Sequence, residues 1–166
     1  MLLGRFCFAG NLQYDVRPMS FVWDALMRQA THILTGAAVG ALFASLLDLE
    51  ALDFIVLGGV FGTVPDLDVL FSGFGRRVHR SAATHSIAAS VGFALAWIPI
   101  LAATDQLIAS SPLDSFELAP SSLVVFLSTF LHAVEDSATV YGCRTLYPVS
   151  MKVYRGIVKY DDWAAN

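Results

Sequence analysis

Four apolar stretches separated by short polar segments dominate the pattern of hydrophobic and polar positions along the chain. They cover residues 33–47, 54–65, 86–104 and 118–134, and none contains Asp, Glu, Lys or Arg. A helix that crosses the hydrocarbon core of a bilayer needs about 20 apolar residues. The first two stretches are shorter, so they must borrow flanking residues or pack as a tight hairpin. The pattern predicts an all-α, multi-pass transmembrane bundle with four spans.

Two pairs of glycines favour close packing of the first two stretches. Gly36 and Gly40 lie in the first stretch, and Gly58 and Gly62 lie in the second. Small residues four positions apart let two membrane helices approach until their backbones touch. Glycine is equally common in membrane helices that make no such contact, so the spacing leaves both interpretations open.

The two ends of the chain lack a long apolar run. Residues 1–30 mix aromatic and charged side chains, so we expect a surface arm that does not cross the membrane. In the tail, Lys152, Arg155 and Lys159 share one helical face, which is typical of an amphipathic helix at a membrane interface. The expected organisation is therefore an arm over residues 1–30, a membrane-embedded domain over 31–150 and a cytoplasmic tail over 151–166.

Composition supports a membrane protein of one domain. The 166 residues are 56% hydrophobic and only 14% charged, whereas soluble domains are about one quarter charged. The two cysteines, Cys7 and Cys143, are far apart and form no C-x-x-C pair, so a disulfide framework and a structural zinc site are not indicated. No motif for nucleic-acid binding and no P-loop is present, and we expect no nucleic-acid partner.

Every Lys and Arg falls in a segment that a four-span topology places on one side of the membrane. These are Arg5, Arg17 and Arg28 before the first stretch, Arg76, Arg77 and Arg80 between the second and third, and Arg144, Lys152, Arg155 and Lys159 after the fourth. The loops on the opposite side contain none. The positive-inside rule therefore predicts a protein of the inner, cytoplasmic membrane with both termini in the cytoplasm.

Histidine and aspartate residues gather at the same ends of the predicted helices as the positive charges. They are His32 before the first stretch, Asp66 and Asp68 after the second, His85 before the third, and His132 and Asp136 at the end of the fourth. Imidazole and carboxylate groups are ligands for divalent metals. Ionisable groups beside a bilayer are costly and suggest function. We predict a metal site formed by His32, Asp66, His85, His132 and Asp136.

Each motif has a simpler interpretation when it is taken alone. His132 and Asp136 are four residues apart, which puts both on one helical face, but this spacing is a weak signal by itself. Thr84 or Ser86 is suited to cap the start of the following helix. Arg80 is either an anchor among lipid headgroups or a clamp for a phosphate group. The interpretation as a metal site depends on all the motifs lying at the same face of the membrane.

The order of these motifs resembles that of the YdjM-like family. The matching residues are Thr31-His32, Pro65-Asp66-x-Asp68, His79-Arg80, Thr84-His85-Ser86, His132-x-x-x-Asp136 and Leu146-Tyr147-Pro148. The family consists of small inner-membrane proteins regarded as metal-dependent hydrolases, so the resemblance implies a multi-pass helical protein with a metal site near one membrane face. It also implies a distant likeness to zinc-dependent phospholipase C and P1-type nucleases. We leave His79 outside the predicted ligand set.

These observations favour a membrane-bound, metal-dependent hydrolase that acts on a phosphoester of a lipid or lipid-linked substrate at the cytoplasmic face. Asp68 or Glu135 would act as general base and Arg80 would bind the phosphate. The ligand types favour zinc, with manganese as the alternative, and allow one or two ions. Two other functions stay open: a non-catalytic membrane scaffold or regulator with a structural metal site, and a small metal-ion transporter. The sequence does not indicate an oligomeric state.

Overall fold

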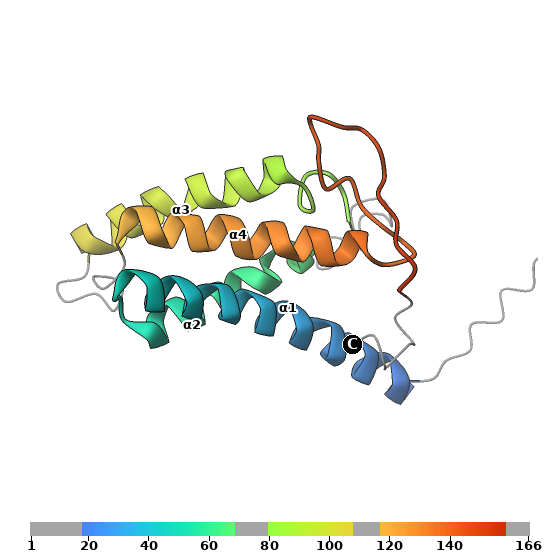
Figure 1. Cartoon of the computed structure of the whole chain (residues 1–166), viewed down its shortest axis with the longest axis horizontal. Coiled ribbons are helices and arrows are strands. Elements are labelled where there is room, and N and C mark those ends of the chain that lie inside the picture. Colours follow the sequence, from blue (N-terminus) through green and yellow to red (C-terminus); the bar gives the residue numbers. More distant parts are fainter. Residues whose placement is uncertain (1–17, 69–79, 108–116, 159–166) are drawn as a thin grey trace, which may run out of the picture.

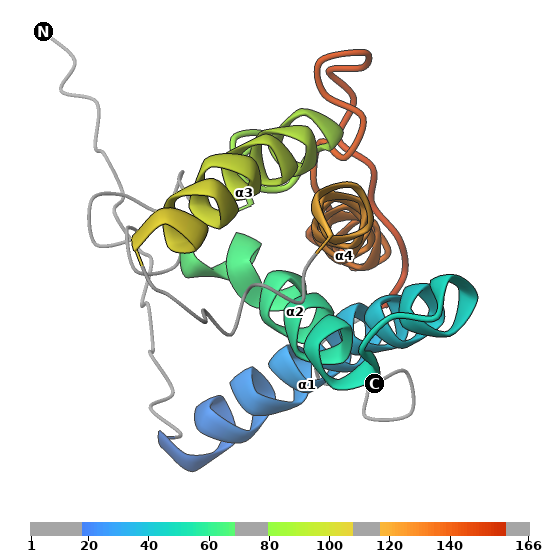
Figure 2. The same cartoon turned by 90° about the vertical axis from the view of Figure 1, so that its left-hand side faces the viewer.

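Four helices that run alternately in opposite directions form an elongated bundle (Figure 1). The computed structural model describes residues 18–68, 80–107 and 117–158. The helices are α1 (Pro18–Leu47), α2 (Ala51–Thr63), α3 (Ile87–Leu107) and α4 (Leu118–Ser137). α4 packs against each of the other three helices, and α1 packs along α2 (Figure 2). The described residues contain two isolated β-bridges but no strand, so the predicted all-α class is confirmed for them.

Two of the helices are long and apolar enough to cross a membrane. They are the section Gln29–Leu47 of α1 and the whole of α4. The apolar section of α3 is shorter, Ile87–Ala103. α2 has 13 residues, which corresponds to about 20 Å at 1.5 Å per residue. Two candidate spans are therefore present, and a four-span topology stays a prediction.

All four helices expose large apolar side chains on the outside of the bundle. Leu34 and Leu46 on α1, Leu52 on α2, Leu95 on α3 and Leu118 on α4 are each more than half exposed. Soluble monomers rarely expose continuous apolar surface, because water disfavours it. Lipid chains would cover this surface without that cost. The outer surface therefore fits a membrane environment along every helix.

The hairpin of α1 and α2 is held by direct backbone contact at its glycines. A Cβ atom added at Gly36 would overlap the carbonyl group of Gly58, and one added at Gly58 would overlap the carbonyl group of Gly36. A Cβ atom at Gly62 would overlap the carbonyl oxygen of His32 in the same way. These glycines therefore serve close packing, which the sequence had left undecided. The contact sets the start of the first apolar stretch beside the end of α2.

The apolar core lies toward the opposite end of the bundle from the histidines and aspartates. It comprises Ala44, Phe54, Leu57, Trp97, Leu101, Val124 and Val125. The indole N–H of Trp97 donates a hydrogen bond to the Ser121 hydroxyl over 3.0 Å, so this buried polar group is satisfied. One end of the bundle is thus apolar inside, while the other contains a polar cluster.

The first helix begins before the first apolar stretch. α1 starts at Pro18, so residues 18–30 continue the helix, and the backbone shows no boundary at residue 30. Proline is well tolerated in the first turn of a helix because its missing N–H would have no partner there. The remainder of the expected arm, residues 1–17, lies outside the described residues.

The expected interfacial helix in the tail is wrong for residues 151–158, and residues 159–166 lie outside the described part. Residues 151–158 contain no helix, and two of them form β-bridges with residues that follow α4. Cys143 and Tyr154 exchange backbone hydrogen bonds of 3.1 and 2.9 Å, and the Gly156 N–H donates to the Thr139 carbonyl over 3.0 Å. These long-range bonds satisfy backbone groups that a helix would have satisfied locally.

Candidate metal centre

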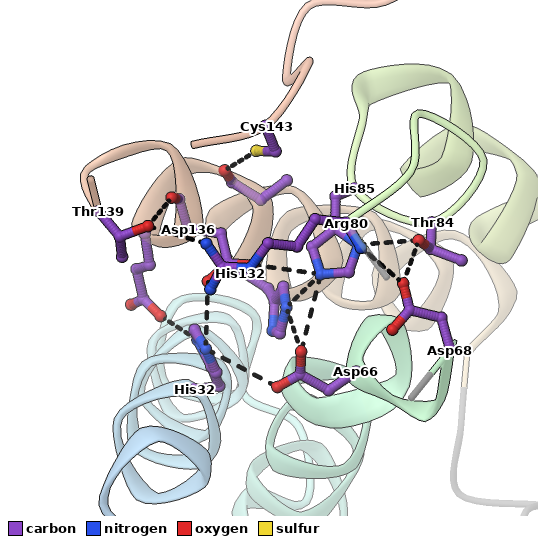
Figure 3. A network of polar contacts seen from close by, with 12 residues as sticks. His32, Asp66, Asp68, Arg80, Thr84, His85, His132, Asp136, Thr139 and Cys143 are labelled. Atoms are coloured by element: carbon purple, nitrogen blue, oxygen red, sulfur yellow. Dashed lines mark hydrogen bonds and ion pairs between the residues drawn. The ribbon is translucent and has the colours of Figure 1, made fainter. Parts of the chain in front are cut away.

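Four side chains from three parts of the chain meet at one end of the bundle (Figure 3). Asp66 lies in a 3₁₀ turn that continues α2, and His85 lies just before α3. His132 and Asp136 lie one turn apart near the end of α4. One donor atom of each side chain lies within 4.8 Å of the other three. The two histidines and Asp136 are buried, and Asp66 is partly buried.

The two histidines point the same ring nitrogen toward each other. His132 Nδ1 lies 2.7 Å from the carbonyl oxygen of Gly62, which only accepts, so this nitrogen must carry hydrogen. His85 Nδ1 lies 2.8 Å from the Thr84 hydroxyl, which itself donates to Asp68 and therefore accepts from the imidazole. With both Nδ1 atoms protonated, the lone pairs of the neutral rings sit on Nε2. These two Nε2 atoms are 3.1 Å apart.

Two carboxylate oxygens face the same point as the imidazole nitrogens. Asp66 Oδ1 lies 3.5 Å from His132 Nε2 and 3.7 Å from His85 Nε2. Asp136 Oδ2 lies 3.3 Å from His85 Nε2, yet it is buried and meets no hydrogen-bond geometry. A buried carboxylate oxygen without a donor is unfavourable. The cluster therefore presents more acceptors to its centre than the chain supplies donors for.

A divalent cation fits this donor set. Atoms that each lie about 2.0–2.2 Å from one ion are no more than about 4.4 Å apart, and the four nitrogen and oxygen separations above are all shorter than that. One cation would bind the facing Nε2 lone pairs of His85 and His132 and also the unpaired Oδ2 of Asp136. Two nitrogen and two oxygen ligands suit zinc, and manganese less strongly.

Without a cation, a proton on His85 offsets part of the negative charge of the cluster. Burial by itself would lower the pKa of this imidazole, but the adjacent carboxylates of Asp136 and Asp66 raise it to about 9. Burial would likewise raise the pKa of Asp66, but the adjacent imidazoles of His132 and His85 hold it well below its usual range. Proton and cation therefore compete for the same position.

His32 lies beside the cluster and, like His85 and His132, points its Nε2 toward the aspartates. Its Nδ1 lies 2.5 Å from Glu135 Oε2, and the other oxygen of Glu135 accepts a hydrogen bond from the Thr35 hydroxyl. Its Nε2 lies 3.9 Å from Asp66 Oδ2 and 3.9 Å from Asp136 Oδ1. Its ring also packs on that of His132, with 3.9 Å between the centroids. His32 thus turns its outer nitrogen toward the two aspartates of the cluster.

Arg80 and Asp68 lie outside the cluster and contact its side chains, Arg80 at Asp136 and Asp68 at His85. Arg80 donates to Asp136 Oδ1 and to the Thr139 hydroxyl, both over 2.8 Å. Its backbone has a positive φ of 59°, which is uncommon for a residue with a side chain. The backbone N–H of Arg80 donates to Asp68 Oδ2 over 3.0 Å, and Thr84 donates to the same oxygen over 2.8 Å. Arg80 therefore links the loop before α3 to the end of α4.

The C-terminal segment, residues 138–158, fixes the start of α3. The first N–H groups of a helix have no partner within the helix, and here the Ile87 N–H donates to the Thr145 carbonyl over 2.8 Å. Ser86 accepts a hydrogen bond from the Ala89 N–H over 3.2 Å and so caps the helix. The histidine that precedes this serine is thereby held at the cluster.

Comparison with known proteins places the chain in a family. The sequence profile of the YdjM inner membrane protein family matches residues 27–166, which include the whole cluster. The chain belongs to the YdjM inner membrane protein family. No curated protein and no solved structure matches it. The predicted family and the inner-membrane setting are thus confirmed, while the orientation of the termini stays a prediction.

In this YdjM family member, the structure brings four of the five predicted ligands into one cluster. The four are Asp66, His85, His132 and Asp136, and the fifth, His32, lies beside them. Of the residues predicted to be catalytic, Asp68 and Arg80 contact the cluster residues His85 and Asp136, and Glu135 contacts His32. His79 lies outside the described residues. Metal ligation and the catalytic roles stay predictions.

Several groups that orient the cluster side chains were not predicted from the sequence. Thr84 was considered a helix cap, but Ser86 makes that bond and Thr84 joins Asp68 to His85 instead. The Gly62 carbonyl orients His132, and no side-chain pattern reports a backbone acceptor. Nothing in the sequence linked Thr35 to Glu135, which is far along the chain. These contacts depend on helix packing.

Proposed function

We propose that the protein is a membrane-bound, metal-dependent hydrolase that cleaves a phosphoester of a lipid or lipid-linked substrate at the cytoplasmic face. The facing Nε2 atoms of His85 and His132, 3.1 Å apart beside two aspartates, support this proposal most strongly. Structural metal sites are closed by protein ligands, whereas catalytic sites keep access for water. Here the side chain of Asp66 is 13% exposed, and that of Glu135, which precedes Asp136 in the chain, is 26% exposed. That access favours catalysis over a structural role.

The chemistry requires a nucleophile, a proton acceptor and charge stabilisation. In hydrolysis, the oxygen of water bonds to phosphorus, the ester P–O bond breaks, and the proton lost by water ends on the departing alcohol. A bound divalent cation supplies Lewis acidity and lowers the pKa of water toward neutrality. We assign Glu135 to accept the proton, because its side chain is 26% exposed, whereas that of Asp68 is 2% exposed.

Arg80 has a positioning role in this proposal. Its guanidinium holds Asp136 Oδ1 and so directs the other oxygen of that carboxylate toward His85. It is also the one described arginine or lysine bonded to the cluster, and its charge offsets part of the negative potential that a phosphate would meet. We therefore expect Arg80 to affect both metal retention and the binding of an anionic substrate.

The surface near the cluster supports a lipid substrate. In the C-terminal segment, the side chains of Val149 and Ile157 are 87% and 92% exposed. The exposed residues Arg144, Lys152 and Arg155 lie in the same segment, at the end of the bundle that holds the cluster (Figure 1). Apolar and basic side chains together suit the acyl and phosphate layers of an anionic membrane surface.

Transport is less well supported than hydrolysis. Away from the cluster, the buried polar side chains of the described helices are hydroxyls, namely Ser90, Ser121, Ser128 and Thr129. A path for a metal ion across the bilayer normally carries ionisable groups at depth. Within the described residues, such groups gather at one end of the bundle. This distribution fits a site at one membrane face.

The proposed function is tested with protein purified in lipid nanodiscs and loaded with Zn²⁺ or Mn²⁺. Release of phosphate or alcohol is measured on lipid phosphomonoesters, lipid diphosphates and a soluble chromogenic phosphoester. We expect metal-dependent hydrolysis that chelator abolishes, that His85→Ala abolishes and that Ser128→Ala retains. Metal-loaded protein that hydrolyses none of these substrates would reject the assignment and favour a structural metal site.

A further inference from the structure

We propose that the centre holds a second divalent cation, bound by His32 Nε2, Asp66 Oδ2 and Asp136 Oδ1. This inference rests on the proposed metal-dependent function and specifies the number of ions and their ligands. It makes the two aspartates bridging ligands, each with one oxygen directed to each cation position.

The division of the two carboxylates is visible first at Asp66. Its Oδ1 lies 3.5 and 3.7 Å from Nε2 of His132 and His85, respectively. Its Oδ2 lies 3.9 Å from Nε2 of His32. The side chain therefore turns one oxygen toward the first pair of imidazoles and the other toward the third imidazole.

Asp136 repeats this division from the opposite side of the cluster. Its Oδ2 lies 3.3 Å from His85 Nε2, while its Oδ1 lies 3.9 Å from His32 Nε2. Both separations at His32 are within the limit of about 4.4 Å for two atoms that bind one ion. Each of these two oxygens thus lies close enough to His32 Nε2 to bind the same ion, and both aspartates also belong to the first position.

The orientation of His32 is that of a metal ligand. Glu135 accepts from Nδ1 over 2.5 Å, and Thr35 holds the other oxygen of Glu135. A carboxylate on one ring nitrogen fixes the imidazole and leaves the other nitrogen to face a metal. Thr84 and Asp68 hold His85 in the same way. An ion pair between His32 and Glu135 alone would not require Nε2 to face two further carboxylates.

Neighbouring donors leave room for the second cation. Arg80 donates to Asp136 Oδ1 over 2.8 Å, and Gln29 donates to Asp66 Oδ2 over 3.3 Å. A carboxylate oxygen has two lone pairs, so each oxygen can accept one hydrogen bond and still face a cation.

Charge also favours two ions over one. With neutral imidazoles, the carboxylates of Asp66, Asp68, Glu135 and Asp136 carry four negative charges, and Arg80 supplies one positive charge. One divalent ion therefore leaves the centre with a net negative charge. A second divalent ion makes the net charge of the centre positive. A slightly positive centre is what an anionic phosphoester requires.

The test compares wild-type protein with His32→Asn and Ser90→Ala in nanodiscs. Asparagine keeps a donor for Glu135 but removes the Nε2 ligand, so it separates ligation from folding. Ser90 is buried in α3 and bonds the Ser86 carbonyl, so its variant controls for a buried polar change. Each protein is dialysed against Mn²⁺, and bound metal is counted by elemental analysis. Electron paramagnetic resonance then shows whether the ions are magnetically coupled.

We expect two Mn²⁺ per chain with a coupled spectrum in wild type and in Ser90→Ala. In His32→Asn we expect one ion with the spectrum of an isolated Mn²⁺. One ion in the wild type would overturn the second site but leave the hydrolase proposal standing. Two coupled ions in His32→Asn would overturn the ligand assignment. Wild-type protein that binds no ion would overturn the proposed function as well.

Discussion

The carbonyl oxygen of Gly62 accepts a hydrogen bond from Nδ1 of His132 over 2.7 Å. The same glycine lies against the His32 carbonyl, where any Cβ atom would overlap it. One residue therefore joins helix packing to the orientation of an imidazole. The separation of α1 from α2 and the direction of His132 Nε2 are consequently linked.

Replacing Gly62 with alanine should disturb the metal centre and the hairpin together. The new methyl group meets backbone, which cannot rotate away as a side chain can, so we expect a loss of about 1–3 kcal/mol in stability. Metal affinity should fall with it. Gly92→Ala is the matched control, because a Cβ atom there meets nothing within 4 Å, and alanine should stabilise that helix by up to about 1 kcal/mol. Equal metal affinity in the two variants would contradict the link.

His132→Ala should lose tightly bound metal without loss of membrane insertion. The change removes one proposed ligand, and we expect the dissociation constant for Zn²⁺ to rise by more than about 100-fold, which is more than the loss of a residue that only orients a ligand would cause. Ser128→Ala, one turn earlier on α4, removes a buried hydroxyl that has no hydrogen-bond partner and should bind metal normally. Isothermal titration of metal-free protein measures both. Wild-type affinity in His132→Ala would exclude this residue as a ligand.

Thr84→Val should weaken metal binding although threonine is not a predicted ligand. The Thr84 hydroxyl connects Asp68 to His85 Nδ1, and without it the imidazole loses its fixed tautomer and direction. Changes to such supporting groups typically reduce metal affinity by about 10- to 100-fold. Thr63→Val is the control, since the Thr63 hydroxyl donates to the Val60 carbonyl of its own helix. If both variants bind Zn²⁺ equally well, Thr84 does not position His85.

Metal binding should depend on pH through His85. Its pKa in the metal-free protein is raised from 6.5 to about 9, so the ring is charged at neutral pH and must lose a proton when metal binds. The affinity should rise about tenfold per pH unit up to about pH 9 and then level off. The metal-free protein should also lose the stability that this proton contributes as pH rises through about 9. Titrations in buffers of different ionisation enthalpy count the protons released, and a value near zero would contradict this account.

Both ends of the chain should lie on the cytoplasmic side together with the metal centre. All ten Lys and Arg residues belong to that side in the four-span topology. In a chain with Cys7 and Cys143 changed to serine, an impermeant maleimide applied to spheroplasts should label Glu117→Cys but not Ser81→Cys. Lysis should expose the second site. Labelling of Ser81→Cys before lysis would reverse the orientation.

Local sequence was sufficient to locate α3 and α4. Their apolar stretches were predicted to start at residues 86 and 118, and the helices start at Ile87 and Leu118. Absence of charge over such a length is a local property, and in a membrane it requires a helix to satisfy the backbone. The glycine spacings likewise indicated that α1 and α2 could touch. Those predictions needed no knowledge of distant contacts.

The tail was mispredicted because its partners lie elsewhere in the chain. Lys152 and Arg155 have helical spacing, but Tyr154 between them pairs with Cys143 through backbone bonds. Gly156 and Val158 pair in the same way with residues 138–140. Gly142, with φ of +66°, allows the turn that makes this pairing possible. A periodic pattern over a few residues cannot outweigh hydrogen bonds formed across the fold.

For the candidate centre, the sequence determined the kinds of residue and their common level at one end of the helices. His32, Asp66, His85, His132 and Asp136 each lie at or near the end of an apolar stretch, and alternating helices bring those ends together. Only the tertiary structure decided which nitrogen of each histidine faces inward and which oxygen of each aspartate it meets. Those choices depend on second-layer partners, including a backbone carbonyl, whose positions follow from helix packing rather than from any local pattern.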